Sequence, residues 1–155
     1  MQIIKNFLCF ILLITFIIIL TGCNKTTMDA GSDDYGNLMS SANQSVDKLE
    51  VYYFHRTARC YSCNTIGQYV RETMEQKYSE QIKDGVIDFR QLNVELPENK
   101  EIAKKFQASG SSLYINRIID GQNNIEQDMN VWRLLKSEDQ FKSYLENKID
   151  SYLGT

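Results

Sequence analysis

The chain has 155 residues, with 17 Lys or Arg, 20 Asp or Glu and a single His, so its formal net charge at pH 7 is −3. This length suits one modest domain once a leader is set aside. The mild acidity, without a basic patch or an interleaving of aromatic and basic residues, argues against nucleic-acid binding.

The first 22 residues have the features of a secretory signal. Lys5 is their only charged residue, and residues 7–20 are apolar apart from Thr15. That run matches the hydrophobic region of a signal peptide, and it is short for a membrane-spanning helix, which needs about 20 apolar residues. We therefore expect residues 1–22 to be a signal peptide.

The apolar run ends in Leu20-Thr21-Gly22-Cys23, which resembles the bacterial lipobox. The resemblance implies that Cys23 is acylated, with palmitate as a typical acyl group, and becomes the first residue of the mature chain. Each buried methylene of such a chain contributes about 0.8 kcal/mol to membrane binding. The expected location is the extracytoplasmic side of a bacterial membrane, where the exported protein is held by its lipid anchor.

Residues 23–47 are rich in Asn, Ser, Thr, Asp and Gly, which predicts a flexible tether. The folded domain is then expected at 48–155, beginning with a strand at 49–54. A helix is predicted from residue 60 to about residue 84, because apolar side chains recur there at helical spacing. These side chains are Ile66, Val70, Met74, Tyr78 and Ile82, and Gly85 predicts the end of the helix.

The remaining chain alternates between predicted strands and helices. We expect a strand at 86–94, a short helix at 98–107 after Pro97, a strand at 112–119, a hairpin turn at Asp120-Gly121, a partner strand at 124–128, and a last helix after the capping pattern 137–140. The order β-α-β-α-β-β-α predicts an α/β domain whose central mixed sheet has a parallel crossover portion, an antiparallel edge hairpin and flanking helices.

Cys60 and Cys63 lie where the first predicted strand meets the first predicted helix. Two cysteines three positions apart at a helix start are close enough to form a disulfide. The positive helix N-terminus, together with Arg56, Arg59 and His55, would favour the thiolate of Cys60. Thiolate is the nucleophile of thiol–disulfide exchange, so the motif indicates redox chemistry.

Three other readings of the cysteine pair stay open. One is a purely structural bridge, although a loop this small constrains the unfolded chain little. A second is a two-sulfur site at Cys60 and Cys63 for a soft ion such as Cu(I) or trivalent arsenic. A closed zinc site is disfavoured, because it needs four ligands and the domain offers two Cys and one His. The third is a redox-inert subunit that only binds a partner.

Motif and element order together make residues 48–153 resemble a thioredoxin fold. The domain is also similar to the arsenic-operon ArsF family, known as nitrophenyl compound nitroreductase subunits. The matching residues are 51–55, Arg59-Cys60 with Cys63, Asn93-Val94 and 110–113. The resemblance implies that Cys60 is the nucleophile and Cys63 the resolving cysteine, without a cofactor. It further implies a protein thiol or disulfide partner, or a membrane electron donor.

The sequence departs from the thioredoxin pattern in three places. Ser112, or Ser111 if the alignment slips by one, stands where thioredoxins have a cis-proline. The first strand has Tyr52-Tyr53-Phe54 where thioredoxins have a buried carboxylate, and Tyr61-Ser62 separates the cysteines in place of Gly-Pro. His55 is predicted either to tune the Cys60 thiol or only to hydrogen-bond the loop. His55, Arg59, Tyr61 and Ser112 are therefore the candidate modulating residues.

Overall fold

The computed structural model describes residues 46–155, so the predicted signal peptide, Cys23 and nearly all of the tether lie outside the described residues. The described chain forms one four-stranded sheet in the order β2-β1-β3-β4. Its strands are β1 (Lys48–His55), β2 (Ile87–Asn93), β3 (Ser112–Ile119) and β4 (Gln122–Asp128). β1 pairs in parallel with β2 and antiparallel with β3, and β3 pairs antiparallel with β4.

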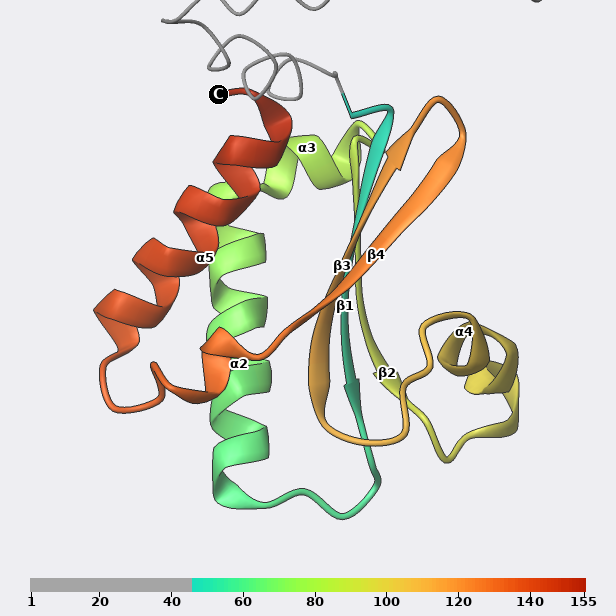
Figure 1. The fold of residues 1–155 in the computed structure, drawn as a ribbon. Coiled ribbons are helices and arrows are strands. Elements are labelled where there is room, and N and C mark those ends of the chain that lie inside the picture. The colour runs from blue at the N-terminus through green and yellow to red at the C-terminus, as the bar shows by residue number, and fades with distance from the viewer. Residues whose placement is uncertain (1–45) are drawn as a thin grey trace, which may run out of the picture. The chain divides into compact units, whose positions relative to one another are not determined.

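The helices lie on both faces of this sheet. They are α2 (Tyr61–Lys77), α3 (Ser79–Lys83), α4 (Lys100–Lys105) and α5 (Glu138–Leu153), with short 3-10 turns at Pro97–Asn99 and Asn130–Trp132. The long helices α2 and α5 lie side by side on one face, and α4 lies on the other (Figure 1). The predicted element order and the thioredoxin-like α/β class are both confirmed. Within residues 46–155, no helix is both long and apolar enough to cross a membrane.

The single helix predicted over residues 60–84 is wrong, because the structure divides it into α2 and α3. The break falls at Tyr78, whose backbone leaves the helical region at φ −114° and ψ 19°. The buried Tyr78 hydroxyl donates to the Asp150 carboxylate of α5 at 2.8 Å. An apolar pattern continues across such a break because Tyr78 and Ile82 still face the core. Gly85, at φ +78°, follows α3 as predicted.

The helix predicted at 98–107 is also shorter than expected. A 3-10 turn replaces its start, and α4 ends at Lys105. Gln107 then adopts φ 54°, and the Ala108 amide donates back to the Ala103 carbonyl at 2.8 Å. These bonds satisfy the last carbonyl groups of α4. The predicted turn at Asp120-Gly121 has positive φ at both residues, as a two-residue hairpin requires.

Strand β1 lies in the middle of the sheet and sends alternate side chains to its two faces. Leu49, Val51 and Tyr53 belong to the larger buried cluster with α2 and α5. Tyr52 and Phe54 belong to a smaller cluster with α4. Because both faces of β1 are buried, the strand is rigidly held at its carboxyl end, where the cysteine motif begins.

Candidate active site

Cys60 and Cys63 lie at the N-terminus of α2 and are joined by a disulfide, with their Cα atoms 5.1 Å apart. Cys60 is the N-cap residue, and its sulfur accepts a hydrogen bond from the Cys63 amide at 3.1 Å. Cys60 is exposed, whereas Cys63 is partly buried. The two cysteines therefore differ in exposure, and Cys60 is the more accessible to a large partner.

The electrostatic setting of Cys60 favours a thiolate in the reduced protein. α2 has 17 residues, and no acidic side chain lies in its first turn to offset the positive helix N-terminus. The Cys63 amide already points at the Cys60 sulfur and can donate to a thiolate there. This contact places the positive end of the helix directly on the predicted nucleophile.

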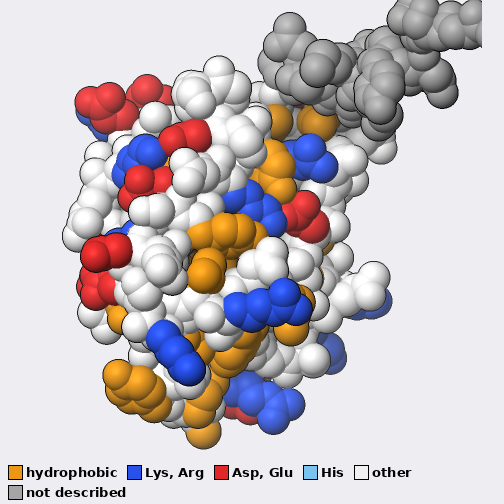
Figure 2. All heavy atoms as spheres, turned by 60° about the vertical axis from the view of Figure 1, so that its left-hand side comes forward, with side chains coloured by type: hydrophobic (Ala, Val, Ile, Leu, Met, Phe, Trp, Pro, Cys, Tyr) orange, Lys and Arg blue, Asp and Glu red, His pale blue; other side chains and the backbone are white. Residues whose placement is uncertain are grey.

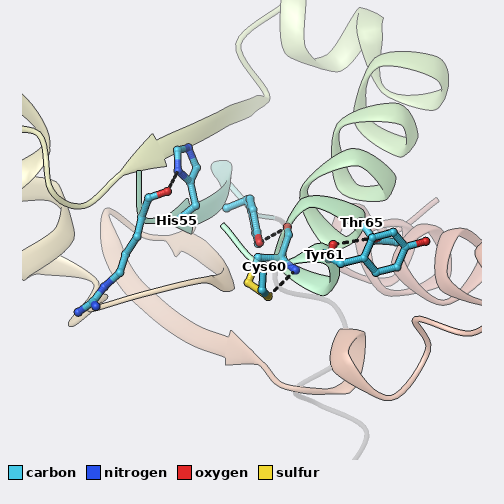
Figure 3. The surroundings of a disulfide bond; sticks show 7 residues. His55, Cys60, Tyr61 and Thr65 are labelled. Carbon is cyan, nitrogen blue, oxygen red and sulfur yellow. Dashed lines mark hydrogen bonds between the residues drawn. A yellow bond between two sulfur atoms is a disulfide. The ribbon is translucent and has the colours of Figure 1, made fainter. Parts of the chain in front are cut away.

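His55 contacts Arg59, the residue before Cys60, rather than the cysteines. The His55 side chain is buried at the end of β1, and its Nδ1 lies 3.0 Å from the Arg56 carbonyl oxygen. Nδ1 therefore carries the proton, and Nε2 accepts from the Arg59 guanidinium at 2.5 Å. Burial, aided by the charge of Arg59, lowers the pKa of His55, so its ring is neutral near pH 7. Figure 3 shows His55 set apart from the disulfide.

Arg56 serves the loop rather than the sulfurs. Its guanidinium donates to the Ser109 carbonyl at 3.3 Å and lies 3.9 Å from the Glu95 carboxylate. Glu95 also accepts from the Thr57 amide at 3.0 Å, and this bond is the main reason that the pKa of Glu95 is lowered. These contacts fasten the loop between β1 and α2 to the segment that follows β2.

The other two modulating residues lie on different sides of the motif. The Tyr61 ring is 86% exposed and points outward from the start of α2 (Figure 3). Ser112 is buried opposite Phe54 in the sheet, on the α4 face, and its hydroxyl donates to the Gly110 carbonyl at 3.2 Å. The structure therefore does not bring Ser112 together with the cysteines. No cis peptide bond occurs within residues 46–155.

Tyr53 is the residue that sequence reasoning missed. Its ring is fully buried on the α2 face, and its hydroxyl donates to the Cys63 carbonyl at 2.6 Å. Burial raises the pKa of Tyr53, and hydrogen bonding from the Ser111 side chain and the charge of Arg59 partly oppose that rise. The period of two along β1 could have indicated this contact, since Tyr53 shares the inward face with Val51.

Gly67 allows the Tyr53 ring to lie this close to α2. A Cβ placed on Gly67 would lie 2.8 Å from Cε1 of Tyr53, too near for any real side chain. A glycine inside a helix costs about 1 kcal/mol relative to alanine. Gly67 is one helical turn after Cys63, so the close approach falls directly beneath the motif.

Among residues 46–155, no group of three or more His, Cys, Asp or Glu side chains is placed to hold a metal ion.

Exposed apolar side chains gather at the end of the domain that holds the motif. Four large hydrophobic residues are exposed among those described: Tyr61, Val86, Leu96 and Met129. Tyr61 begins α2, Leu96 follows the end of β2, and Met129 follows the end of β4, which pairs with the start of β3. These three positions share one end of the sheet. In Figure 2, hydrophobic side chains are most prominent in the lower half, toward the end where α2 begins.

No protein-family model matches this chain, and no curated protein matches it. Solved structures do match it. A thioredoxin from Fasciola hepatica is 18% identical, with 69% of this chain and 93% of that chain covered and a TM-score of 0.39. Thioredoxin O2 from Arabidopsis thaliana, in its oxidised state, is 18% identical, with 67% and 85% covered and a TM-score of 0.40. The Trx4 domain of ERdj5 is 12% identical, with 72% and 91% covered and a TM-score of 0.44.

The topology and the position of the motif define the fold without reference to identity. A parallel β-α-β unit leads into an antiparallel hairpin and a last helix, and the cysteine pair caps the first helix after the central strand. Residues 48–153 therefore have a thioredoxin-like fold that carries a Cys-x-x-Cys disulfide.

Proposed function

We propose that this protein is a thiol–disulfide oxidoreductase in which Cys60 exchanges disulfides with a protein partner and Cys63 resolves the intermediate. One observation carries the proposal. The exposed Cys60 sulfur caps α2, accepts the Cys63 amide and is bonded to a less accessible sulfur. A structural bridge has no need of one exposed sulfur at the positive end of a helix, whereas an exchange reaction does.

The reaction has two steps. In the reduced protein, the Cys60 thiolate attacks one sulfur of a partner disulfide, and the other partner sulfur leaves as a thiolate and takes up a proton. Cys63 then loses its proton and attacks the Cys60 sulfur, which closes the internal disulfide and releases the second partner thiolate. Two electrons pass from the dithiol to the partner, and the reverse sequence oxidises a partner dithiol.

The apolar end of the domain supports a protein as the partner. Tyr61, Leu96 and Met129 are exposed at the end of the sheet that holds the motif, and aromatic residues and Met are enriched where proteins bind one another. The loop carboxylate of Glu95 is already paired with Arg56. An apolar segment flanking a disulfide is the substrate that this surface fits.

Trapping the intermediate tests the proposal. In Cys63→Ser the resolving step is lost, so mixed disulfides with partner proteins should accumulate through Cys60. Cys60→Ser should trap none, and both variants should reduce insulin at less than about 1% of the parent rate, since each removes an essential sulfur. The double variant is the matched control for trapping. If both single variants reduce insulin as fast as the parent, exchange does not occur at this pair.

The proposal extends to where the reaction takes place. Cys23, in the lipobox-like segment, would carry the acyl anchor, and the tether after it would hold the domain near the outer face of a bacterial membrane. Labelling with a palmitate analogue tests this: the parent should be labelled and should sediment with membranes, and Cys23→Ser should do neither. A Cys9→Ser variant is the control, and labelling that persists in Cys23→Ser would refute the anchor.

A further inference from the structure

Tyr53 connects the motif to the sheet at the residue that resolves the intermediate. Its hydroxyl donates to the Cys63 carbonyl at 2.6 Å, from a ring without any exposed surface. The Ser111 side chain, in the turn before β3, also interacts with this hydroxyl and partly offsets the rise in the pKa of Tyr53. One buried oxygen thus links β1, the first turn of α2 and the segment that precedes β3.

The contact between Tyr53 and α2 requires a glycine at position 67, which lowers the intrinsic stability of the helix. Gly67 occupies a helix interior, where alanine would favour the helix by about 1 kcal/mol. Any Cβ there would strike the Tyr53 ring, and the Gly67 carbonyl in turn accepts from Gln91 of β2 at 2.5 Å. The bond from Tyr53 to the Cys63 carbonyl and the bond from Gln91 to the Gly67 carbonyl hold the first two turns of α2 against the sheet.

Positional control matters most after the disulfide has opened. The bond between Cys60 and Cys63 restrains the first turn of α2 only in the oxidised protein. In the mixed disulfide, Cys60 is joined to the partner and Cys63 has no covalent restraint. The first turn of a helix also lacks part of its backbone hydrogen bonding and tends to fray. Loss of position by about 1 Å can slow an intramolecular reaction up to 100-fold.

We propose, on the basis of the function proposed above, that Tyr53 is the positioning residue for the resolving step. Through the carbonyl of Cys63, and supported by Ser111, it keeps the Cys63 sulfur within reach of the Cys60 sulfur in the mixed disulfide. Cys60, the N-cap residue of α2, takes no part in this contact with Tyr53. The Cys63 thiolate then attacks Cys60, the internal disulfide forms, and the partner sulfur leaves as a thiolate that takes up a proton.

An aromatic disulfide reports the two sulfurs separately. The reduced full chain, with Cys9→Ser and Cys23→Ser so that only Cys60 and Cys63 react, is mixed with dithiobis(nitrobenzoate). Attack by Cys60 releases the first coloured thiolate at a rate proportional to reagent concentration. Attack by Cys63 on the mixed disulfide releases the second at a rate independent of it. The second rate is a readout that a loss of overall stability alone would not change.

In Tyr53→Phe we expect the first rate to stay within about twofold of the parent, while the second falls about tenfold, as loss of one hydrogen bond permits. Gly67→Ala, which retains the hydroxyl but displaces the ring, should also slow the second step, and Ser111→Ala should slow it less. Tyr52→Phe is the matched control. It removes the hydroxyl of the neighbouring buried tyrosine, which donates to Asp88 on the opposite face, and should change neither rate.

The outcomes separate the two proposals. If the parent releases both thiolates and Tyr53→Phe copies both of its rates, the positioning role is overturned and the oxidoreductase stands. The same holds if Tyr52→Phe slows the second step as much as Tyr53→Phe does. A parent that releases no second thiolate has no resolving cysteine, and both proposals then fail. Circular dichroism of each variant establishes that it is folded.

Discussion

The two faces of the sheet are covered by clusters that differ in size and in the type of side chain. On the face covered by α2 and α5, apolar side chains from β1, β2 and β3 pack against those of the two long helices. On the other face, the short α4 covers only an aromatic cluster of Tyr52, Phe54, Phe106 and Tyr114. A surface hollow of about 330 Å³ adjoins this cluster, and charged residues such as Arg90 occupy the rest of that face.

This difference predicts that the two faces contribute unequally to the stability of the domain. The α2 face combines the larger core with the rigid support that the cysteine motif requires, since Tyr53 belongs to that core. The α4 face has the smaller core, beside a surface hollow. Substitutions on the α2 face should therefore cost more stability than similar ones on the α4 face.

A matched pair of phenylalanines gives the largest expected contrast. Phe141 of α5 is fully buried and stacks edge-on against Tyr69 at 5.3 Å between ring centroids. Phe141→Ala should lower the unfolding free energy by about 3–5 kcal/mol, measured by urea denaturation. Phe106→Ala should cost about 2–3 kcal/mol, because its ring borders the hollow, and water can fill the space it leaves. Equal costs would contradict the comparison of the two faces.

A second pair compares a largely buried lysine with a more exposed one, each bonded to a buried carboxylate. Lys148 bonds at 2.9 Å to Asp128, whose side chain has no exposed surface, and it also pairs with Glu126. Lys148→Met should cost about 3 kcal/mol, because the buried Asp128 carboxylate loses its cation and keeps only neutral donors, the Tyr144 hydroxyl and the Asn130 amide. On the α4 face, Lys105 bonds at 2.9 Å to Glu50 but is itself 36% exposed.

Lys105→Met should therefore cost at most about 1 kcal/mol. Glu50 would still accept from the Asn116 amide at 2.7 Å, so its carboxylate keeps a partner. Thermal unfolding of the two variants measures the difference. A Lys105→Met variant as unstable as Lys148→Met would show that the α4 face is no more hydrated than the other.

A third test concerns the close approach beneath the motif. Gly67→Ala gains helix propensity but forces a Cβ to within 2.8 Å of the Tyr53 ring. We expect a net loss of about 1–2 kcal/mol in urea denaturation, since overpacking outweighs the propensity gain. Gly110→Ala is the control, because nothing lies within 4 Å of its added Cβ, and it should stay within about 0.5 kcal/mol of the parent. A stabilised Gly67→Ala would mean that the ring moves freely.

The smallest expected effect is a dependence of stability on pH that comes from His55. Burial lowers the pKa of His55 below its usual value of about 6.5, so below that pH the unfolded chain binds a proton that the folded chain does not. The contribution of neutral His55 to the free energy of unfolding is therefore complete above about pH 6.5. It is lost as the pH falls from there through the lower pKa of the folded state. Protonation also opposes the bond from Arg59.

His55 is the only histidine in the chain, which makes the assignment direct. Urea midpoints measured at intervals from about pH 7 down to pH 5.5 should fall in the parent. In His55→Gln this part of the decline should disappear. A decline of the same size in both proteins would assign it to carboxyl groups instead.

Local patterns along the chain determined most of the fold. The apolar patterns located the first three strands and the two long helices, and Asp120-Gly121 located the hairpin and its partner strand. Ser137 located the start of α5, where its hydroxyl accepts from the Gln140 amide at 3.4 Å. The spacing of Cys60 and Cys63 at a strand–helix junction likewise indicated their disulfide. Such features depend on neighbours a few positions apart, which the sequence shows directly.

Only the tertiary structure decided which distant groups meet. The break at Tyr78 depends on Asp150 of α5, the state of His55 depends on its burial, and the contact of Tyr53 with Cys63 depends on how α2 lies against β1. The structure likewise placed Ser111 beside Tyr53 and Ser112 on the opposite face. Each contact is set by the packing of whole elements, because a rotation of one helix by a single residue would replace it with another.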